Sequence, residues 1–367
     1  MRLHRPSFQF PVSSFRFVVA TALGLGILFT AAGCDQLRQT RLAGRTMGTT
    51  YHIVVAHGWL DRPRGLDVQV TRRLEDLNRR FSTYLSDSEI NRFNRWPAGG
   101  KPFKASAEFY RLLQTAHRIH RLSGGAWDGT VRPLVDLWGF GPAPARGTVP
   151  AAGEIAALRN TVGFDQIALG PALTIAKRRG EIALDLASIA KGYGVDALAE
   201  LIRSHGYRDF LVEIGGEVVA SGRRPGGGPW KVGINVPLAG APATAVYGVV
   251  SLSDRAMATS GDYRNFFEID GHRYAHIIDP RTGYPAANGV ISATVLAPDC
   301  TLADGLATAL CVMGQGPGLK LVETLPGIEA LILTTREGGE IREHRSSGFQ
   351  FTPGPSKFYR ENTPPSP

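Results

Sequence analysis

The order in which helical and strand periodicities follow one another constrains this chain more than any other feature. Apolar residues recur at helical spacing at Val70, Leu74 and Leu77, and again on one face of residues 106–122. Strand-like segments dominate from residue 210 onward. Because helices and strands do not alternate regularly, the sequence predicts an α+β fold with packed helices and a mixed or antiparallel sheet, and it argues against a doubly wound parallel sheet.

The same patterns predict individual elements along the chain. Strands are expected at residues 49–56, 164–169, 172–176, 181–186, 210–214, 230–236, 247–253 and 329–334, with a hairpin of 265–269 and 272–278 across Asp270-Gly271. Further helices are expected shortly after Pro150 and at residues 188–205, 300–311 and 318–325. The Pro-rich end, 352–367, is expected to lack fixed structure, which leaves residues 34–351 as one domain.

The first 33 residues have the layout of an export signal. Residues 1–16 are basic and polar, and residues 17–32 are an uncharged apolar run that is short for a membrane span. The ending Ala31-Ala32-Gly33-Cys34 resembles a bacterial lipobox, whose cysteine is lipidated, and Asp35 resembles an inner-membrane retention signal. We therefore expect a periplasmic protein anchored to the inner membrane through Cys34; the alternative is an uncleaved anchor helix.

Charge and cysteine content narrow the function classes. The formal net charge is +9, but the basic residues are scattered and form no stripe interleaved with aromatic residues, so nucleic-acid binding is not expected. Cys300 and Cys311 lie in one predicted helix, where eleven residues separate them by about 16 Å, too far for a disulfide. They are expected to be buried free thiols.

Asp304 and Thr308 stand one helical turn apart and present a carboxylate and a hydroxyl on the same side. Such hard oxygen ligands suit Mg²⁺, which completes its shell with water and phosphate. Alternatively, Asp304 is an exposed first-turn acid that the helix dipole favours, and Thr308 is a packed residue.

The segment Asp185–Gly194 (DLASIAKGYG) joins a strand to a helix start, where backbone N–H groups and Lys191 are able to hold a phosphate. The competing interpretation is helix capping by Asp185 or Ser188. Trp127 lies among glycines in GGAWDGTVRP and is either a stacking surface or a core tryptophan beside a tight turn. His276 precedes the turn-like segment 279–283.

Eight segments occur in one order, which makes the set far more specific than any member. They are RTMGT at 45, FSTYLSDSEI at 81, GGAWDGTVRPLVDLWGFG at 124, DLASIAKGYGVD at 185, EIGGE at 213, ATSGDY at 258, HIIDPRTGYP at 276 and ADGLATAL at 303. Over residues 42–345 this series resembles the ApbE family of periplasmic FAD:protein FMN transferases. The resemblance implies a T-fold-like α+β architecture.

The resemblance also implies the site residues. FAD contacts are expected from Met47, Tyr84, Ala126, Trp127, Asp128, Asp185, Lys191, His276 and Ile277. Mg²⁺ ligands are expected from the Ser188 carbonyl, Asp304, Thr308 and, less directly, Thr301. Trp127 stands where the family more often has Phe, which preserves a stacking face.

The implied reaction splits FAD, attaches FMN through a phosphoester to a threonine of a partner protein and releases AMP. Mg²⁺ and Lys191 would offset phosphate charge, and His276, or Asp262 as second candidate, would accept the threonine proton. The expected partners are membrane subunits of redox complexes. Two alternatives remain from the sequence: an FAD pyrophosphatase and a non-catalytic flavin-binding lipoprotein.

Overall fold

The fold is built on one eight-stranded antiparallel sheet. The computed structural model describes residues 37–141, 148–238, 240–242, 244–262, 265–335 and 340–354. In sheet order, the strands are β1 (Arg38–Thr46), β2 (Thr49–His57), β6 (Phe210–Ile214), β7 (Glu217–Ser221), β10 (Arg255–Gly261), β13 (Val290–Ala297), β14 (Glu329–Thr335) and β15 (Ile341–Arg345). Every neighbouring pair is antiparallel.

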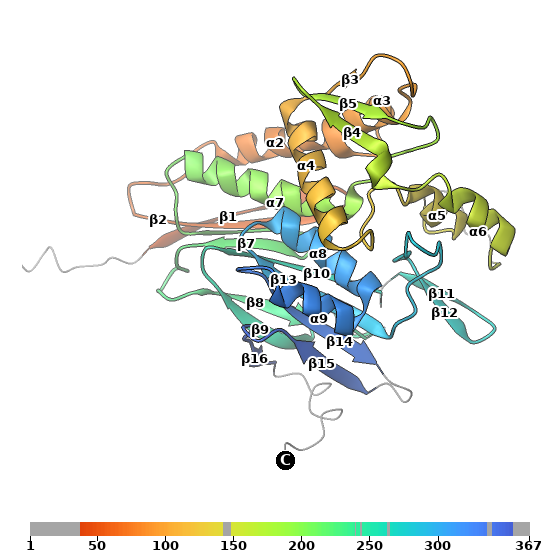
Figure 1. Cartoon of the computed structure of the whole chain (residues 1–367). Coiled ribbons are helices and arrows are strands. Elements are labelled where there is room, and N and C mark those ends of the chain that lie inside the picture. The colour runs from red at the N-terminus through yellow and green to blue at the C-terminus, as the bar shows by residue number, and fades with distance from the viewer. Residues whose placement is uncertain are drawn as a thin grey trace, which may run out of the picture.

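Helices cover one face of this sheet (Figure 1). They are α2 (Leu66–Phe81), α4 (Ala107–Leu122), α7 (Ala187–Ser204), α8 (Cys300–Met313) and α9 (Gln315–Glu323). Helices α2 and α4 each bury one apolar stripe, as their sequence spacing predicts. Helix α8 is buried almost all round, because α7, α4, α9 and the sheet surround it.

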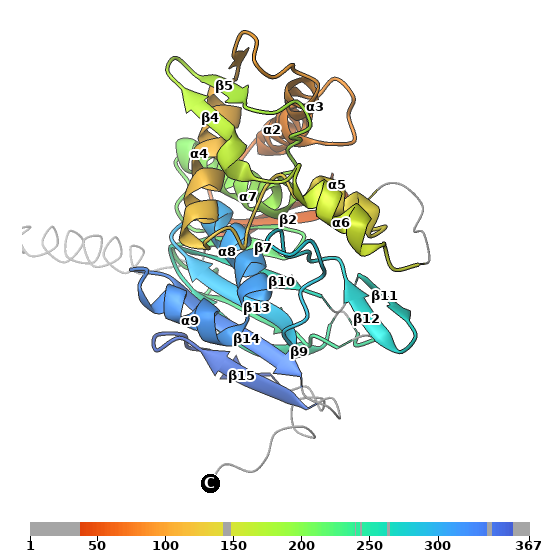
Figure 2. The same ribbon diagram turned by 45° about the vertical axis from the view of Figure 1, so that its right-hand side comes forward.

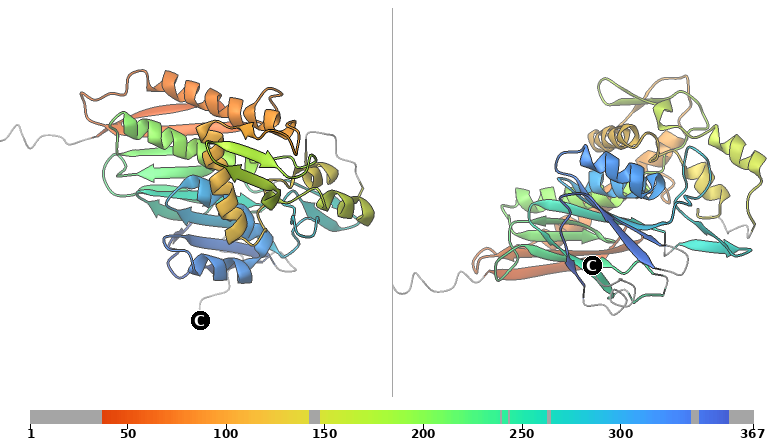
Figure 3. Two further views of the ribbon diagram at one scale, coloured as in Figure 1. Left: turned by 45° about the horizontal axis from the view of Figure 1, so that its top comes forward. Right: turned by 60° about the horizontal axis from the view of Figure 1, so that its bottom comes forward.

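A small sheet covers the other face and closes a second core (Figure 3). Its order is β16 (Thr352–Pro353), β9 (Val246–Leu252) and β8 (Trp230–Asn235). Strands β7, β10, β13 and β14 send side chains into this core and also contribute to the cores on the helix side. The central strands are therefore covered on both faces.

Two smaller groups of elements complete the structure (Figure 2). One is a three-stranded sheet, β3 (Phe103–Lys104), β5 (Thr174–Lys177) and β4 (Ile167–Gly170), with helix α3 (Glu89–Asn94) and the short 3-10 helix Phe164–Gln166. The other combines α5 (Arg132–Leu137), α6 (Ala152–Arg159) and the hairpin β11 (Phe266–Ile269) and β12 (His272–Ala275).

The structure confirms the α+β class and most expected elements, including the hairpin across Asp270-Gly271 and the two buried free cysteines. Three expectations are corrected. Residues 164–166 are a 3-10 helix, and residues 181–186 form no strand. Thr352–Pro353 pair with β9, so the C-terminal tail does not begin at 352.

The export signal and Cys34 lie outside the described residues. Within the described part of the chain, no helix is long and apolar enough to cross a membrane.

The crossing of α7 and α8 leaves no room for a side chain at Gly192. A Cβ added there would lie 2.8 Å from the carbonyl carbon of Cys300 and 3.0 Å from Cβ of Asp304, and one of these contacts is with backbone. The two helices therefore pack at their closest only because residue 192 is glycine.

We predict that Gly192→Ala lowers the free energy of unfolding by about 1–3 kcal/mol, the usual cost of overpacking. Gly153→Ala is the matched control, because it lies in helix α6 with nothing within 4 Å of the added Cβ; alanine there should be neutral or stabilising. Urea denaturation of both variants measures the difference. Equal stability of the two variants would contradict the close packing described for α7 and α8.

Candidate functional site

Two hairpin turns meet the first half of helix α7. Met47 lies in the β1–β2 turn, and a Cβ added at Gly194 of α7 would lie 3.2 Å from its Cε. Gly215, in the β6–β7 turn, has φ of 60°, and a Cβ added there would lie 3.4 Å from Cδ of Lys191. Glycine suits both requirements of residue 215, its left-handed backbone and its proximity to the lysine stem. The turns thus form a wall beside Lys191.

A lysine and two buried carboxyl groups converge at this wall. Nζ of Lys191 lies 2.8 Å from Oε1 of Glu217 and 3.7 Å from Oδ1 of Asp304. The three residues come from α7, β7 and α8. The side chains of Glu217 and Asp304 are each 3% exposed, whereas that of Lys191 is 27% exposed. The Lys191 side chain is therefore partly exposed, while its ammonium is held against two buried acids.

The electrostatics of this cluster are set by burial and by its excess of acids. Burial raises the pKa of Asp304, although Lys191 opposes the shift. Burial and the neighbouring Asp304 raise the pKa of Glu217 to about 8, again against the effect of Lys191. Burial alone would lower the pKa of Lys191, but Asp304 and Glu217 outweigh it and raise that pKa. With both acids ionised the cluster carries one uncompensated negative charge, which a cation would neutralise.

Asp304 also contacts the backbone of α7. The N–H of Gly192 donates to its Oδ2 at 3.1 Å. In a regular helix this N–H bonds to the carbonyl four residues earlier, that of Ser188. The bond to Asp304 competes for that donor and leaves the Ser188 carbonyl with capacity for another partner.

Thr308 lies one turn beyond Asp304, as the sequence predicts. Its hydroxyl is 3.0 Å from Oγ of Ser260 and donates to the Asp304 carbonyl at 3.3 Å. Thr301 is engaged elsewhere, because its hydroxyl donates to Asp196 at 2.6 Å. The same Asp196 accepts from the backbone N–H of Cys300 and caps α8. A ligand role for Thr301 gains no support from this geometry.

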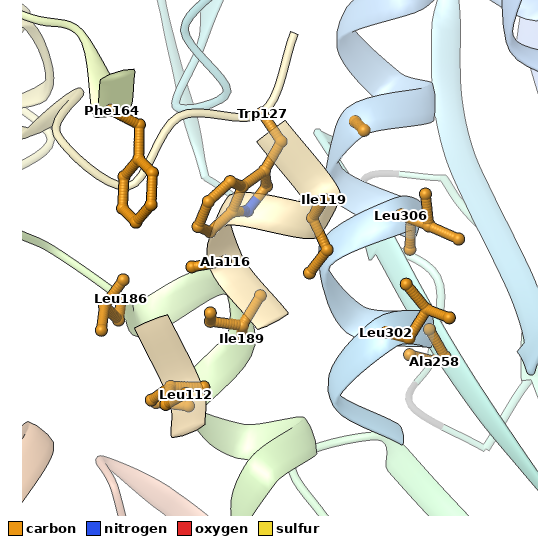
Figure 4. Close-up of a cluster of buried hydrophobic side chains, with 14 of the residues drawn as sticks. Leu112, Ala116, Ile119, Trp127, Phe164, Leu186, Ile189, Ala258, Leu302 and Leu306 are labelled. Atoms are coloured by element: carbon orange, nitrogen blue, oxygen red, sulfur yellow. The ribbon is translucent and has the colours of Figure 1, made fainter. Parts of the chain in front are cut away.

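Trp127 is a core residue, and the expectation that its ring is a free stacking face is wrong for the structure described. The side chain is 2% exposed and packs edge-on against Phe164, with ring centroids 5.7 Å apart (Figure 4). Its Nε1 donates to Oγ of Ser188 at 2.9 Å. The ring therefore helps to fix the start of α7, and it joins the 124–133 loop to the candidate metal ligands.

The remaining expected flavin contacts are dispersed around this point. Asp128 is buried and accepts from the N–H groups of Thr130 and Phe164, so its carboxylate already stabilises the loop. Asp185 accepts from the N–H of Ala187 at the start of α7. Tyr84 is 82% exposed. Ala126 and Ile277 are both buried.

His276 is oriented by a backbone carbonyl. Its Nδ1 lies 3.2 Å from the carbonyl oxygen of Asn265. Because a carbonyl only accepts, Nδ1 carries the hydrogen and Nε2 is the nitrogen able to take a proton. Burial lowers the pKa of His276 below its ordinary value of 6.5, so the ring is neutral at pH 7.

Asp262, the second candidate base, is also partly buried. Its Oδ1 lies 3.6 Å from Nη2 of Arg273 and, among the described residues, has no hydrogen-bond partner. Burial raises its pKa.

Sequence reasoning missed Glu217 as a site residue. It closes the EIGGE segment and is the only charged residue of β7, EVVAS, whose five residues are all buried. A single acid in an otherwise uncharged buried strand can be recognised in the sequence, because such a charge is costly without a partner.

We predict that Lys191→Met destabilises the chain by about 3–5 kcal/mol at pH 8, the usual cost of removing one partner from buried charges. Both acids have raised pKa values, so the folded state binds protons more tightly than the unfolded state and stability falls as pH rises. The deficit should therefore shrink at pH 5. Urea denaturation at both pH values tests this, with Lys320→Met as control because Lys320 is exposed. A loss of stability in Lys191→Met that does not change with pH would contradict the raised pKa values of the two acids.

Three comparisons relate this structure to known proteins. The sequence profile of the ApbE family matches residues 47–332. The FAD:protein FMN transferase of Vibrio cholerae is 40% identical over 330 residues, covering 89% of this chain and 97% of that protein. The protein of the same name from Haemophilus influenzae is 38% identical over 330 residues, covering 88% of this chain and 93% of that protein.

The solved structure of the flavin transferase ApbE from Vibrio cholerae aligns with a TM-score of 0.77 at 40% identity, covering 85% of this chain and 98% of that chain. This confirms the α+β architecture that the resemblance implied. Because the profile spans Met47, Lys191, Glu217, His276 and Asp304, the chain that carries this site belongs to the ApbE family.

Proposed function

We propose that this chain is a Mg²⁺-dependent FAD:protein FMN transferase, which attaches FMN to a threonine of a partner protein and releases AMP. The observation that carries the proposal is the Lys191–Glu217–Asp304 cluster in a chain that matches, over almost their whole length, relatives named for this transfer. A flavin-binding protein without catalysis would have no need for two buried acids that exceed their lysine by one charge.

The residues around Asp304 fit a hard divalent cation. The Asp304 carboxylate, the Thr308 hydroxyl and the Ser188 carbonyl would hold it, all of them oxygen donors. A bound Mg²⁺ would neutralise charge on the pyrophosphate of FAD and on the leaving AMP. With both acids ionised the cluster has one more negative than positive charge, which favours such an ion. No three His, Cys, Asp or Glu side chains converge as a metal site among the described residues, and the proposed set needs only one.

Lys191 would act as the fixed positive charge of the site. Glu217 and Asp304 keep it protonated, and a phosphate oxygen of FAD would approach the ammonium from the partly exposed side of the side chain. Met47, Ala126, Asp185 and Ile277 would contact FAD near the start of α7, where backbone N–H groups also favour anions. Trp127 would contribute through its backbone and its bond to Ser188.

The transfer step needs one base. The threonine Oγ forms a bond to the FMN-side phosphorus, the bond from that phosphorus to the bridging oxygen breaks, and AMP leaves with the bridging oxygen. The threonine proton goes to Nε2 of His276, which the Asn265 carbonyl orients. With water in place of threonine, the same groups would make an FAD pyrophosphatase, so the acceptor decides between the two activities.

We also propose export and anchoring through Cys34, on the basis of the sequence of residues 1–34. A lipid anchor would hold the enzyme and membrane redox subunits at one surface and raise their encounter rate. This fits an acceptor that is itself bound to a membrane.

We predict covalent FMN on an exported partner that bears an accessible segment of Ser/Thr, Gly/Ala, Ala/Thr and a final Thr. With FAD and Mg²⁺, the partner band should become fluorescent in a denaturing gel, and its mass should rise by one FMN. Asp304→Asn should abolish the band. Changing the final threonine of the partner to alanine is the control. Equal release of FMN and AMP with and without partner would identify a pyrophosphatase instead.

We predict that His276→Gln lowers kcat/KM for transfer by about 10²–10⁴, the usual contribution of a general base. In the wild type the base is neutral above its lowered pKa, so activity should be full at pH 7 and fall as pH drops below 6.5. The variant should lose this acid limb. A pH profile that keeps the limb in the variant would assign the base elsewhere, with Asp262→Asn as the next variant to test.

A further inference from the structure

The end of the molecule away from the candidate site carries two exposed apolar side chains. Trp59 and Leu60 follow strand β2 in the loop that leads to α2, and they are 71% and 83% exposed. This loop projects at the same end as the start of β1 (Figure 1). Adjacent large apolar side chains that remain this exposed are a sign of an interaction surface.

The turn that presents them is firmly held. Nδ1 of His57 donates to the Gly58 carbonyl at 2.8 Å, and the N–H of Asp61 donates to the same carbonyl at 3.3 Å. The hydroxyl of Tyr207 donates to the Asp61 carbonyl at 2.8 Å. The polar backbone is therefore satisfied on both sides of Trp59 and Leu60, and the two side chains stand at the tip of a supported turn.

The surroundings of this turn carry charges of both signs, with arginines in excess. Two cavities of about 530 and 500 Å³ share Gly206, Tyr207 and Arg208 beyond the end of α7. Their charged lining residues and histidines are Arg62, Arg203, Arg208, His57, His205, Asp61, Asp209 and Asp254. Arg38, which pairs with His57, and Arg64, four residues after Leu60, add positive charge. This edge, residues 57–64 with 203–208 and Arg38, complements an anionic surface.

The start of the described chain lies at the same edge. Arg38 pairs with His57 in the β1–β2 ladder. Cys34 precedes Arg38 by four residues, which span at most about 14 Å when fully extended. An acyl chain on Cys34 would therefore enter the bilayer close to Trp59 and Leu60. This step rests on the lipid anchoring proposed above.

We propose that this edge lies against an anionic phospholipid bilayer, with Trp59 and Leu60 at headgroup level and the surrounding arginines on lipid phosphates. Tryptophan prefers the membrane interface, and each arginine near an anionic surface adds attraction. The contact fixes how the enzyme stands, because a flexible lipid tether alone leaves its orientation free.

The orientation has a consequence for the acceptor. Arg203 lies twelve residues after Lys191 on α7, about 18 Å along the helix axis. The candidate site is then held well above the lipid headgroups and at the far end of the molecule from them. A partner must present its threonine on a segment that extends out of the membrane by a comparable distance.

The test measures whether Trp59 lies at headgroup level, within quenching range of bromines placed on the acyl chains close to the headgroup. Full-length protein isolated from membranes is reconstituted into vesicles of phosphatidylglycerol and phosphatidylcholine, with or without dibrominated acyl chains that quench tryptophan at short range. The wild type should be quenched by the brominated lipid, and Trp59→Phe should lose most of that quenching. Trp96→Phe is the matched control, because Trp96 is also exposed but packs against Phe103 of strand β3, and it should keep the quenching.

The charge contribution is tested in the same vesicles. Arg62→Gln with Arg64→Gln should reduce quenching, as should high salt, whereas Arg178→Gln with Arg179→Gln, beyond strand β5, should not. Flavin transfer in detergent should be equal in all these variants, so failure of transfer in the wild type contradicts the proposed function alone. The surface proposal is overturned if Trp59→Phe is quenched like the wild type or if the wild type does not float with the vesicles. It is also overturned if the wild type is a dimer and Trp59→Phe converts it to monomers.

Discussion

The structure depends on burying two acids and one lysine where α7, β7 and α8 meet. Such a cluster is stable only when its members are held close, and Gly192 makes this possible because it lets α8 approach the backbone of α7. Asp304 then receives a backbone N–H, and Glu217 receives the ammonium of Lys191. When both acids are ionised, one negative charge remains unbalanced, and this is the feature that turns a packing contact into a candidate cation site.

The chemical groups of the site are supplied by separate rigid elements. Helix α8 provides Asp304 and Thr308, helix α7 provides Lys191 and the Ser188 carbonyl, and the segment after β12 provides His276. Groups fixed on packed elements lose little orientation when substrate binds, which favours positioning as the source of rate. The opposite end of α7 carries the basic and apolar edge, so one helix connects the chemistry to the surface proposed to face the membrane.

The sequence predicted elements that carry a clear local pattern, most of them half exposed, although α8 and β14 were predicted despite being buried on both sides. Helices α2 and α4 are half exposed, so their apolar stripes are readable, and the β11–β12 hairpin has its Asp270-Gly271 turn. Strands β7, β10 and β13 went unpredicted because both of their faces are covered and period-2 alternation is lost. Of the site, the Asp304 and Thr308 pair followed from helix spacing. The partnership of Glu217 with Lys191, the burial of Asp304 and the core position of Trp127 depend on contacts between distant segments, which no local pattern contains.

Calorimetric titration with Mg²⁺ in two buffers of different ionisation enthalpy tests the central claim most directly, because it counts the protons released on binding. The buried acids have raised pKa values, so a cation that neutralises their excess charge should displace protons. We expect net proton release near pH 7 in the wild type, and loss of both binding and release in Asp304→Asn. Binding without proton release, or binding unchanged in the variant, would contradict the account.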